Sequence, residues 1–166
     1  MADHLGQTAQ GTFRDMLRLE IAPGMRALGF KGSGGRYVLP DDQRWQVVAF
    51  QRNRYSRADY LTFTVNLTVA DRAAWAQTRS DQMWLPEAPS GNTTYPVDKT
   101  IVIRLGNLMP PGGEDRWWEV IPSRTTAQVS SEILRAIETR GIPWLQTGLG
   151  AEDLLGNIPP SDIWRP

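Results

Sequence analysis

The stretch TIVIRLGNLMPPGGEDRWWEVI, residues 100–121, decides how the fold of this chain is interpreted. Two short apolar runs, residues 101–105 and 117–121, stand on either side of a Pro-Pro-Gly-Gly sequence that is typical of a turn. Runs of this length, bounded by turn residues, predict two β-strands. We therefore expect a β-hairpin here, with an arginine inside its first strand and a pair of tryptophans at the start of its second.

The clearest strand lies upstream, at residues 61–69. Apolar and polar side chains alternate strictly along its sequence, LTFTVNLTV. This alternation predicts one sheet face in the core and one open, polar face, as is common in antiparallel sheets. Shorter strands are predicted at residues 37–39 and 45–51, after a glycine-rich segment, residues 31–36, that we expect to be a flexible connector. A short helix capped by an aspartate is predicted at residues 72–82.

Two longer helices are predicted, one before the strands and one after them. Apolar residues recur at three- and four-residue spacing in residues 13–28 and again in residues 125–140, which is typical of amphipathic helices. Pro23 interrupts the first of them, so we expect either a kink or a new helical turn there. Gly141 and Pro143 are expected to end the second.

Strands bracketed by helices indicate an α+β fold, in which an antiparallel sheet of about four or five strands carries the N-terminal and C-terminal helices. A length of 166 residues is typical of one domain, and residues 1–166 are therefore assigned to a single domain. Its core is expected to begin at residues 8–12 and to reach about residue 150. Residues 151–166 are expected to form a tail docked on that core.

Five short motifs, taken in order, carry a resemblance to a known family. They are LGF at residues 28–30, WQVVAFQ at residues 45–51, FTVNL at residues 63–67, RLGNL at residues 104–108 and DRWW at residues 115–118. In this order the chain resembles a bacterial family known only as domain of unknown function 4304. The resemblance spans about residues 13–149 and implies a one-domain α+β layout. It implies no particular activity.

The composition excludes most familiar catalytic centres. The chain has no cysteine, and His4 is its only histidine. Disulfides, thiolate metal sites and cysteine nucleophiles are therefore absent, and an HExxH zinc site, which needs two histidines, cannot be assembled. A Ser-His-Asp triad would have to use His4, which lies close to the N-terminus, and is not expected. We expect no bound metal and no cofactor.

The formal net charge is zero, which argues against a dedicated nucleic-acid binder. The basic segment at residues 52–57, with tyrosines beside it, fits either a solvated turn or a contact with single-stranded nucleic acid. We favour the turn. The N-terminal residues lack the features of a secretory signal, and no apolar run approaches the roughly 20 residues of a membrane helix. A cytoplasmic protein without membrane association is the expectation.

Polar and aromatic residues within the predicted strands form a candidate contact site: Gln51, Asn66, Arg104, Trp117 and Trp118. Burying the three polar side chains costs several kcal/mol unless each finds hydrogen-bond partners. They could form a polar cluster on the open sheet face, where Arg104 grips an anion or a carboxylate of a partner. Trp117 and Trp118 would point to opposite faces, so that one is expected in the core and the other at an interface.

An internal network is the alternative explanation for the same residues. In that case Arg104 pairs with Asp115 or Glu119 across the predicted hairpin, and the cluster is structural. The sequence therefore leaves open whether Arg104 serves the fold or a partner.

These observations favour a small binding or interaction protein without catalytic activity, whose partner is expected to be a protein. An enzyme that works through carboxylate, arginine and asparagine chemistry, without histidine or cysteine, is the alternative. A deep pocket lined by Arg104, Asn66 and a carboxylate would favour the enzyme. A flat aromatic face would favour the binding protein.

Overall fold

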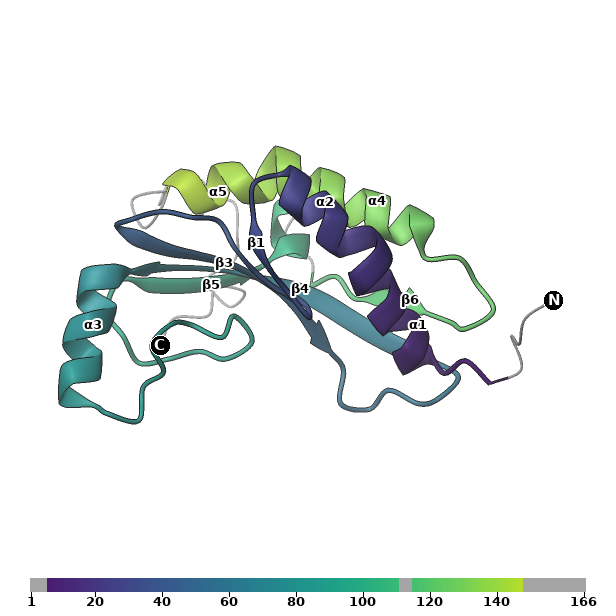
Figure 1. Ribbon diagram of the computed structural model, residues 1–166, viewed down its shortest axis with the longest axis horizontal. Coiled ribbons are helices and arrows are strands. Elements are labelled where there is room, and N and C mark those ends of the chain that lie inside the picture. Colours follow the sequence, from purple (N-terminus) through teal and green to yellow (C-terminus); the bar gives the residue numbers. More distant parts are fainter. Residues whose placement is uncertain (1–5, 111–114, 148–166) are drawn as a thin grey trace.

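The computed structural model describes residues 6–110 and 115–147, and it confirms the α+β class (Figure 1). The strands are β1 (Lys31–Ser33), β2 (Arg36–Val38), β3 (Arg44–Arg52), β4 (Leu61–Asp71), β5 (Thr100–Arg104) and β6 (Trp118–Val120). The helical segments are α1 (Ala9–Met16), η1 (Leu17–Ile21), α2 (Ala22–Ala27), α3 (Arg72–Asp81), η2 (Leu105–Leu108), α4 (Ala127–Ala136), η3 (Ile137–Gly141) and α5 (Ile142–Thr147). His4 and the predicted C-terminal tail, residues 151–166, lie outside the described residues.

All six strands form one antiparallel sheet with the order β1-β2-β3-β4-β5, and β6 pairs with β4. The predicted hairpin between the last two strands is wrong, because both pair with β4 and not with each other. β5 lies along residues 66–70 of β4, and β6 lies along residues 61–63. The 3-10 turn η2 separates them: the Asn107 side chain accepts a hydrogen bond from the Arg104 N–H at 3.1 Å, where β5 ends.

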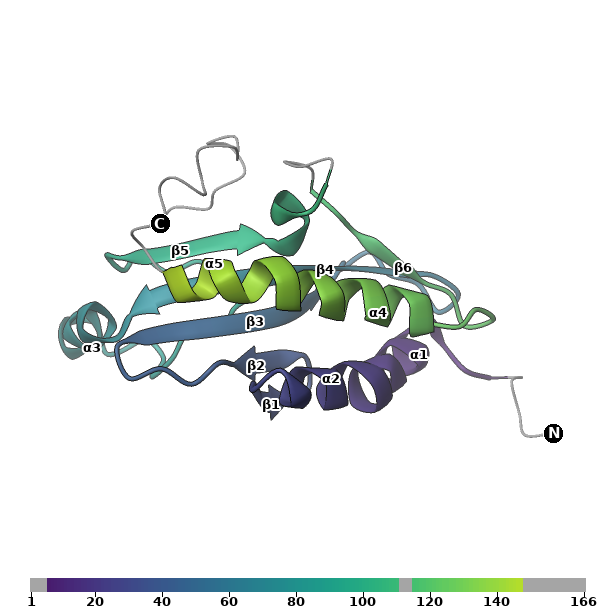
Figure 2. The same cartoon turned by 90° about the horizontal axis from the view of Figure 1, so that it is seen from above.

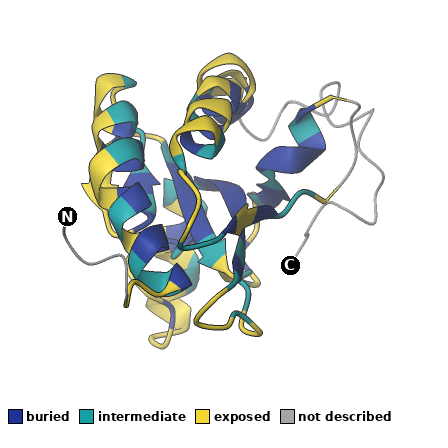
Figure 3. Ribbon diagram, turned by 90° about the vertical axis from the view of Figure 1, so that its right-hand side faces the viewer, coloured by how far each residue is buried: buried dark blue, intermediate teal, exposed yellow. Residues whose placement is uncertain are grey.

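The helices lie on both sides of the sheet. The segments α1–α2 and α4–α5 lie side by side over one face, and α3 with the loop that follows it lies over the other (Figures 1 and 2). Figure 3 shows that buried residues of the helices face the sheet and exposed residues face outward. The main core contains the apolar residues of β4 and residues of both long helices, including Phe13, Phe63 and Ile133.

The second face of the sheet is polar, as the alternation in β4 predicts, but it is not open. Thr64, Asn66 and Thr68 are all buried. A smaller apolar cluster of Ala70, Trp75, Leu85 and Val97 joins β4, α3 and the loop of residues 82–99. The loop therefore covers the polar face and supplies the walls of any site there.

Both long helices continue through their prolines by way of a π-turn. In the first helix the N–H of Ala22 donates to the carbonyl of Leu17, five residues earlier, just before Pro23. A π-turn also precedes Pro143. Proline lacks an N–H and its ring collides with the carbonyl four residues earlier, so a wider turn accommodates it. The expectation that Gly141 and Pro143 end the last helix is therefore wrong.

The glycine-rich segment at residues 31–36 is a β-hairpin and not a flexible connector. Gly34 and Gly35 form its two-residue turn with φ of 64° and 87°, the left-handed conformations that such a turn requires. A side chain at Gly32 would collide with the Arg36 carbonyl across the hairpin. The glycines therefore permit this hairpin to close.

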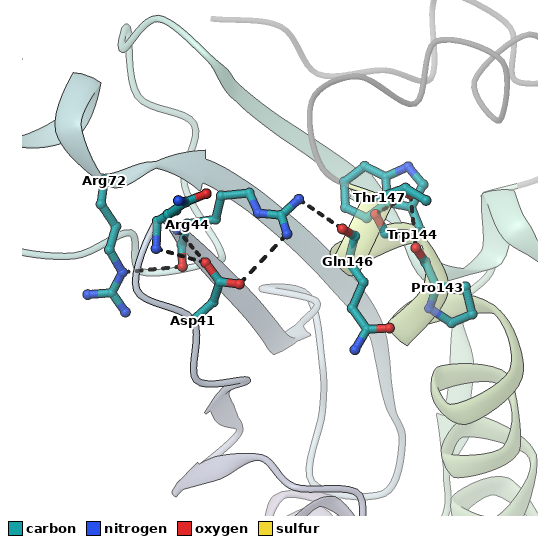
Figure 4. A network of polar contacts seen from close by, with 8 residues as sticks. Asp41, Arg44, Arg72, Pro143, Trp144, Gln146 and Thr147 are labelled. Carbon is teal, nitrogen blue, oxygen red and sulfur yellow. Dashed lines mark hydrogen bonds and ion pairs between the residues drawn. The ribbon is translucent and has the colours of Figure 1, made fainter.

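A polar network joins the start of β3 to the end of α5 (Figure 4). The Asp41 carboxylate accepts hydrogen bonds from the N–H groups of Gln43 at 2.9 Å and Arg44 at 2.8 Å. The Arg44 guanidinium donates to the carbonyl of Gln146 at 2.9 Å, and Arg72 donates to the carbonyl of Arg44 at 3.3 Å. A cation beside the last carbonyls of a helix is favourable, so Arg44 fastens α5 to the sheet.

Candidate functional site

A small pocket lies on the second face of the sheet, where β3, β4 and β5 meet the loop of residues 82–99. Its volume is about 80 Å³. The lining residues are Gln51, Asn66, Gly91, Asn92, Thr93, Thr94, Val102 and Arg104. Three of the five predicted contact residues meet here, because Asn66 lies opposite Arg104 in the β4–β5 register and Gln51 is near the end of the neighbouring β3.

Three side-chain amides form a hydrogen-bonded network at this pocket. The Asn66 amino group donates to Gln51 Oε1 at 2.8 Å and to Asn92 Oδ1 at 3.0 Å. Asn92 in turn donates to the Phe50 carbonyl at 3.3 Å. Within the described residues, the side-chain amide oxygen of Asn66 and the side-chain amino group of Gln51 have no hydrogen-bond partner. The network thus leaves the Asn66 side-chain oxygen available as an acceptor and the Gln51 amino group available as a donor.

Arg104 is held at the edge of the pocket by its neighbours. Its guanidinium forms an ion pair with Asp115 and lies 5.0 Å from the centre of the Trp117 ring. Trp117 Nε1 donates to the same Asp115 carboxylate at 3.0 Å. The sequence left open whether Arg104 pairs with Asp115 or with Glu119, and in the structure it pairs with Asp115. Glu119 instead accepts a hydrogen bond from Tyr60. Because the Asp115 side chain is 47% exposed, this pair lies at the surface and not in the core.

The two adjacent tryptophans have different surroundings. Trp118 is buried and stacks on Phe63, with ring centres 5.8 Å apart, in the main core. Trp117 is half-buried beside Arg104. The structure therefore places Trp117 beside Arg104, a lining residue of the pocket, and Trp118 on the helix-covered face of the sheet.

The loop supplies site residues that the sequence analysis did not single out: Gly91, Asn92, Thr93 and Thr94. Their sequence, GNTT, has the small polar composition of a surface loop. The left-handed φ of Gly91, 88°, and its close approach to Ala49 place this loop against the sheet. A glycine followed by an asparagine in a loop rich in proline was the available signal, although it does not specify what the loop contacts.

The donor set of the pocket is poor in metal ligands. Across residues 6–110 and 115–147, no three Asp, Glu, His or Cys side chains gather closely enough to hold a metal ion. Guanidinium, amide and hydroxyl groups line the pocket. Such groups bind through hydrogen bonds, so the arrangement suits recognition of a polar group.

A family model described as a domain of unknown function, DUF4304, matches residues 21–147. The chain belongs to this family. The DUF4304 match includes every residue that lines the pocket, so the pocket is built within the family domain. Searches of curated proteins and of solved structures found no match to the chain. Membership of the DUF4304 family therefore establishes the kind of domain and assigns no activity.

Within the described part of the chain, none of the helices combines the length and apolar character required to cross a bilayer.

Proposed function

We propose that this DUF4304 protein is a non-enzymatic binding protein that holds a polar group of a protein partner in the pocket of Gln51, Asn66 and Arg104. The observation that carries the proposal is the convergence of these three side chains with Asn92 around one small opening. Trp117 borders it through its contact with Arg104. Polar side chains come together here from strands and from a loop that are distant in sequence.

The size of the pocket favours a small part of a larger partner. Pockets for complete small molecules usually measure roughly 300–1,000 Å³. A volume of about 80 Å³ is well below that range. It fits the end of a side chain or a peptide group, and a protein partner supplies such groups.

The chemistry of the pocket favours a carboxamide. The side-chain oxygen of Asn66 can accept a hydrogen bond, and the side-chain amino group of Gln51 can donate one. A carboxamide offers the matching N–H donor and carbonyl acceptor. The charge of Arg104 is already balanced by Asp115. A second carboxylate would therefore be repelled by Asp115, whereas a neutral amide would not. The Trp117 ring can add apolar contact area, as tryptophan often does at interfaces.

The same features support binding over the enzymatic alternative. None of the residues found to line the pocket in the described structure is a carboxylate. Asp115, which pairs with the lining residue Arg104, already receives hydrogen bonds from Arg104 and Trp117. Glycoside hydrolysis, for example, uses two carboxyl groups roughly 5–10 Å apart across the substrate.

The proposal is tested by a nuclear magnetic resonance titration of the ¹⁵N-labelled protein. The probes are acetyl-glutamine methylamide, acetyl-glutamate methylamide and acetyl-norvaline methylamide, which differ only in the end of the side chain. The glutamine probe should shift the side-chain amide signals of Gln51, Asn66 and Asn92 more than the other two. Equal shifts from the norvaline probe would contradict a site for carboxamides.

A matched pair of variants controls this titration. Gln51→Ala removes a pocket amide, and Gln77→Ala removes an exposed amide from α3. Binding of the glutamine probe should weaken in Gln51→Ala and stay unchanged in Gln77→Ala. An equal effect of both variants would show that the probe binds elsewhere.

A further inference from the structure

A second concave surface lies between the first long helix and the β1–β2 hairpin. It is a groove of about 680 Å³ with residues of α1, η1, α2, the hairpin and the end of β3 along its walls. Four of its lining residues are arginines: Arg14, Arg18, Arg26 and Arg52. The formal net charge of the chain is zero, so the groove is a local concentration of positive charge.

The arginines of the groove have little internal compensation. Arg18 pairs with Asp15 at 3.4 Å, and both side chains are well exposed. Within the described residues, Arg14, Arg26 and Arg52 form no ion pair, and no carboxylate lines the groove. Positive charge gathered in a concave surface attracts anionic partners and accelerates their association.

The floor of the groove is apolar. Phe13 and Leu17 line it, and both are buried members of the main core. The guanidinium groups therefore surround a surface that offers apolar contact. A partner that carries carboxylates next to apolar side chains complements both features.

The groove continues toward the polar pocket. A neighbouring hollow shares Phe13, Leu17 and Arg52 with the groove. The same hollow is lined by Gln51 and Asn92, which also line the pocket. The groove is therefore linked, through this hollow, to two residues that also line the pocket.

We infer that the groove binds an acidic segment of a protein partner, with glutamate or aspartate against the arginines and an apolar residue against Phe13 and Leu17. The inference rests on the proposed role as a binding protein and specifies the chemistry of its partner. Charge complementarity alone would also suit a nucleic acid. The zero net charge of the chain and the apolar floor favour a peptide, because nucleic-acid modules usually carry a basic surplus and contact mainly phosphate.

Fluorescence anisotropy tests the inference with the full chain. The probe is a fluorescein-labelled decapeptide in which glutamate alternates with leucine. Its comparisons are the analogue with lysine in place of glutamate and a single-stranded oligothymidylate of ten nucleotides. The acidic peptide should bind, the lysine analogue should not, and added salt should weaken binding because it screens exposed charges. No binding of the acidic peptide, or tighter binding of the oligonucleotide, would overturn the inference.

Variants locate the binding. Arg14→Ala combined with Arg26→Ala should lower the affinity for the acidic peptide about tenfold, since each exposed ion pair contributes modestly to the binding free energy. The control combines Arg124→Ala with Arg135→Ala, which removes the same charge from exposed positions outside the groove. Unchanged affinity in the groove variant, or an equal loss in the control, would overturn the assignment to the groove. Both groove arginines are exposed, so the variant is expected to fold.

The two sites can fail separately. If the groove variant loses peptide binding, the inference about the groove is supported whatever the result for the pocket. If Gln51→Ala leaves binding of the glutamine probe unaffected, only the proposal about the pocket is refuted. If Gln51→Ala weakens the glutamine probe while the groove variant leaves the peptide unaffected, the pocket stands and the groove is refuted.

Discussion

Gly91 lies so close to Ala49 that a Cβ atom at position 91 would stand 2.6 Å from the Cβ of Ala49. The same atom would be 3.1 Å from the nearer methyl group of Val47. Gly91 also has a φ of 88°, which favours glycine. This contact lets the loop of residues 82–99 approach the second face of the sheet, where the loop forms a wall of the pocket.

We predict that Gly91→Ala lowers the free energy of unfolding by about 2–3 kcal/mol, because it combines overpacking with backbone strain. It should also weaken binding of the glutamine probe, because Asn92 moves with the loop. Chemical denaturation and the titration measure the two effects. Gly34→Ala is the control: Gly34 also has a positive φ but has open space around it, so that variant should show the strain alone. Equal losses in both variants would contradict a tight contact at Ala49.

Phe63→Ala should destabilise the protein by about 3–5 kcal/mol, because it leaves a cavity in the main core. Phe63 is completely buried, and its ring contacts those of Phe13, Phe50 and Trp118. Denaturation by urea provides the measurement. Tyr55→Ala, at a side chain that is 74% exposed, should change stability by no more than about 0.5 kcal/mol. An unchanged midpoint for Phe63→Ala would contradict the assignment of this face to the core.

Asp41 should make stability depend on pH in the acidic range. Burial raises the pKa of the Asp41 carboxyl, but hydrogen bonds from the N–H groups of Gln43 and Arg44 and the charge of Arg44 outweigh it and lower the pKa below its ordinary value of 3.8. Because the pKa is lower in the folded state, the ionised Asp41 carboxylate stabilises the folded protein at pH values above its ordinary pKa. That contribution is lost as pH falls through the folded-state pKa.

Asp41→Asn removes this contribution at every pH. The difference in unfolding free energy between the wild type and the variant should be about 1 kcal/mol near neutrality, because the hydrogen bonds are partly exposed to water. The difference should shrink as the pH falls below the ordinary pKa. Urea denaturation at several pH values measures it, and a difference that stays constant down to the most acid condition would contradict the role of the charge.

The sequence predicted the elements of the fold better than their pairing. The alternation from Leu61 to Val69 predicted β4 and its core face, because a strand pattern depends on neighbouring residues alone. The partners of β5 and β6 depend on contacts with β4 that are distant in sequence, and the predicted hairpin was wrong for that reason. The π-turns before Pro23 and Pro143 were also missed, since proline normally ends or kinks a helix.

The candidate site was predicted in part. Polar residues in apolar strands, such as Asn66 and Arg104, need hydrogen-bond partners when they are buried. This requirement made them candidate site residues from the sequence alone. Asn92 was missed because a loop sequence does not show which surface the loop covers. The groove was missed because Arg14, Arg26 and Arg52 come together only when the hairpin packs beside the first helix.

The most direct test of the binding role of the pocket is to measure Arg104→Ala for both stability and affinity. Because Asp115 is half exposed, loss of its partner should lower the free energy of unfolding by no more than about 1 kcal/mol. We predict that the variant keeps nearly the wild-type stability and that its affinity for acetyl-glutamine methylamide falls about fivefold, as expected for loss of about 1 kcal/mol of binding free energy. A loss of about 3 kcal/mol in stability with unchanged affinity would contradict the binding role and make Arg104 part of the architecture.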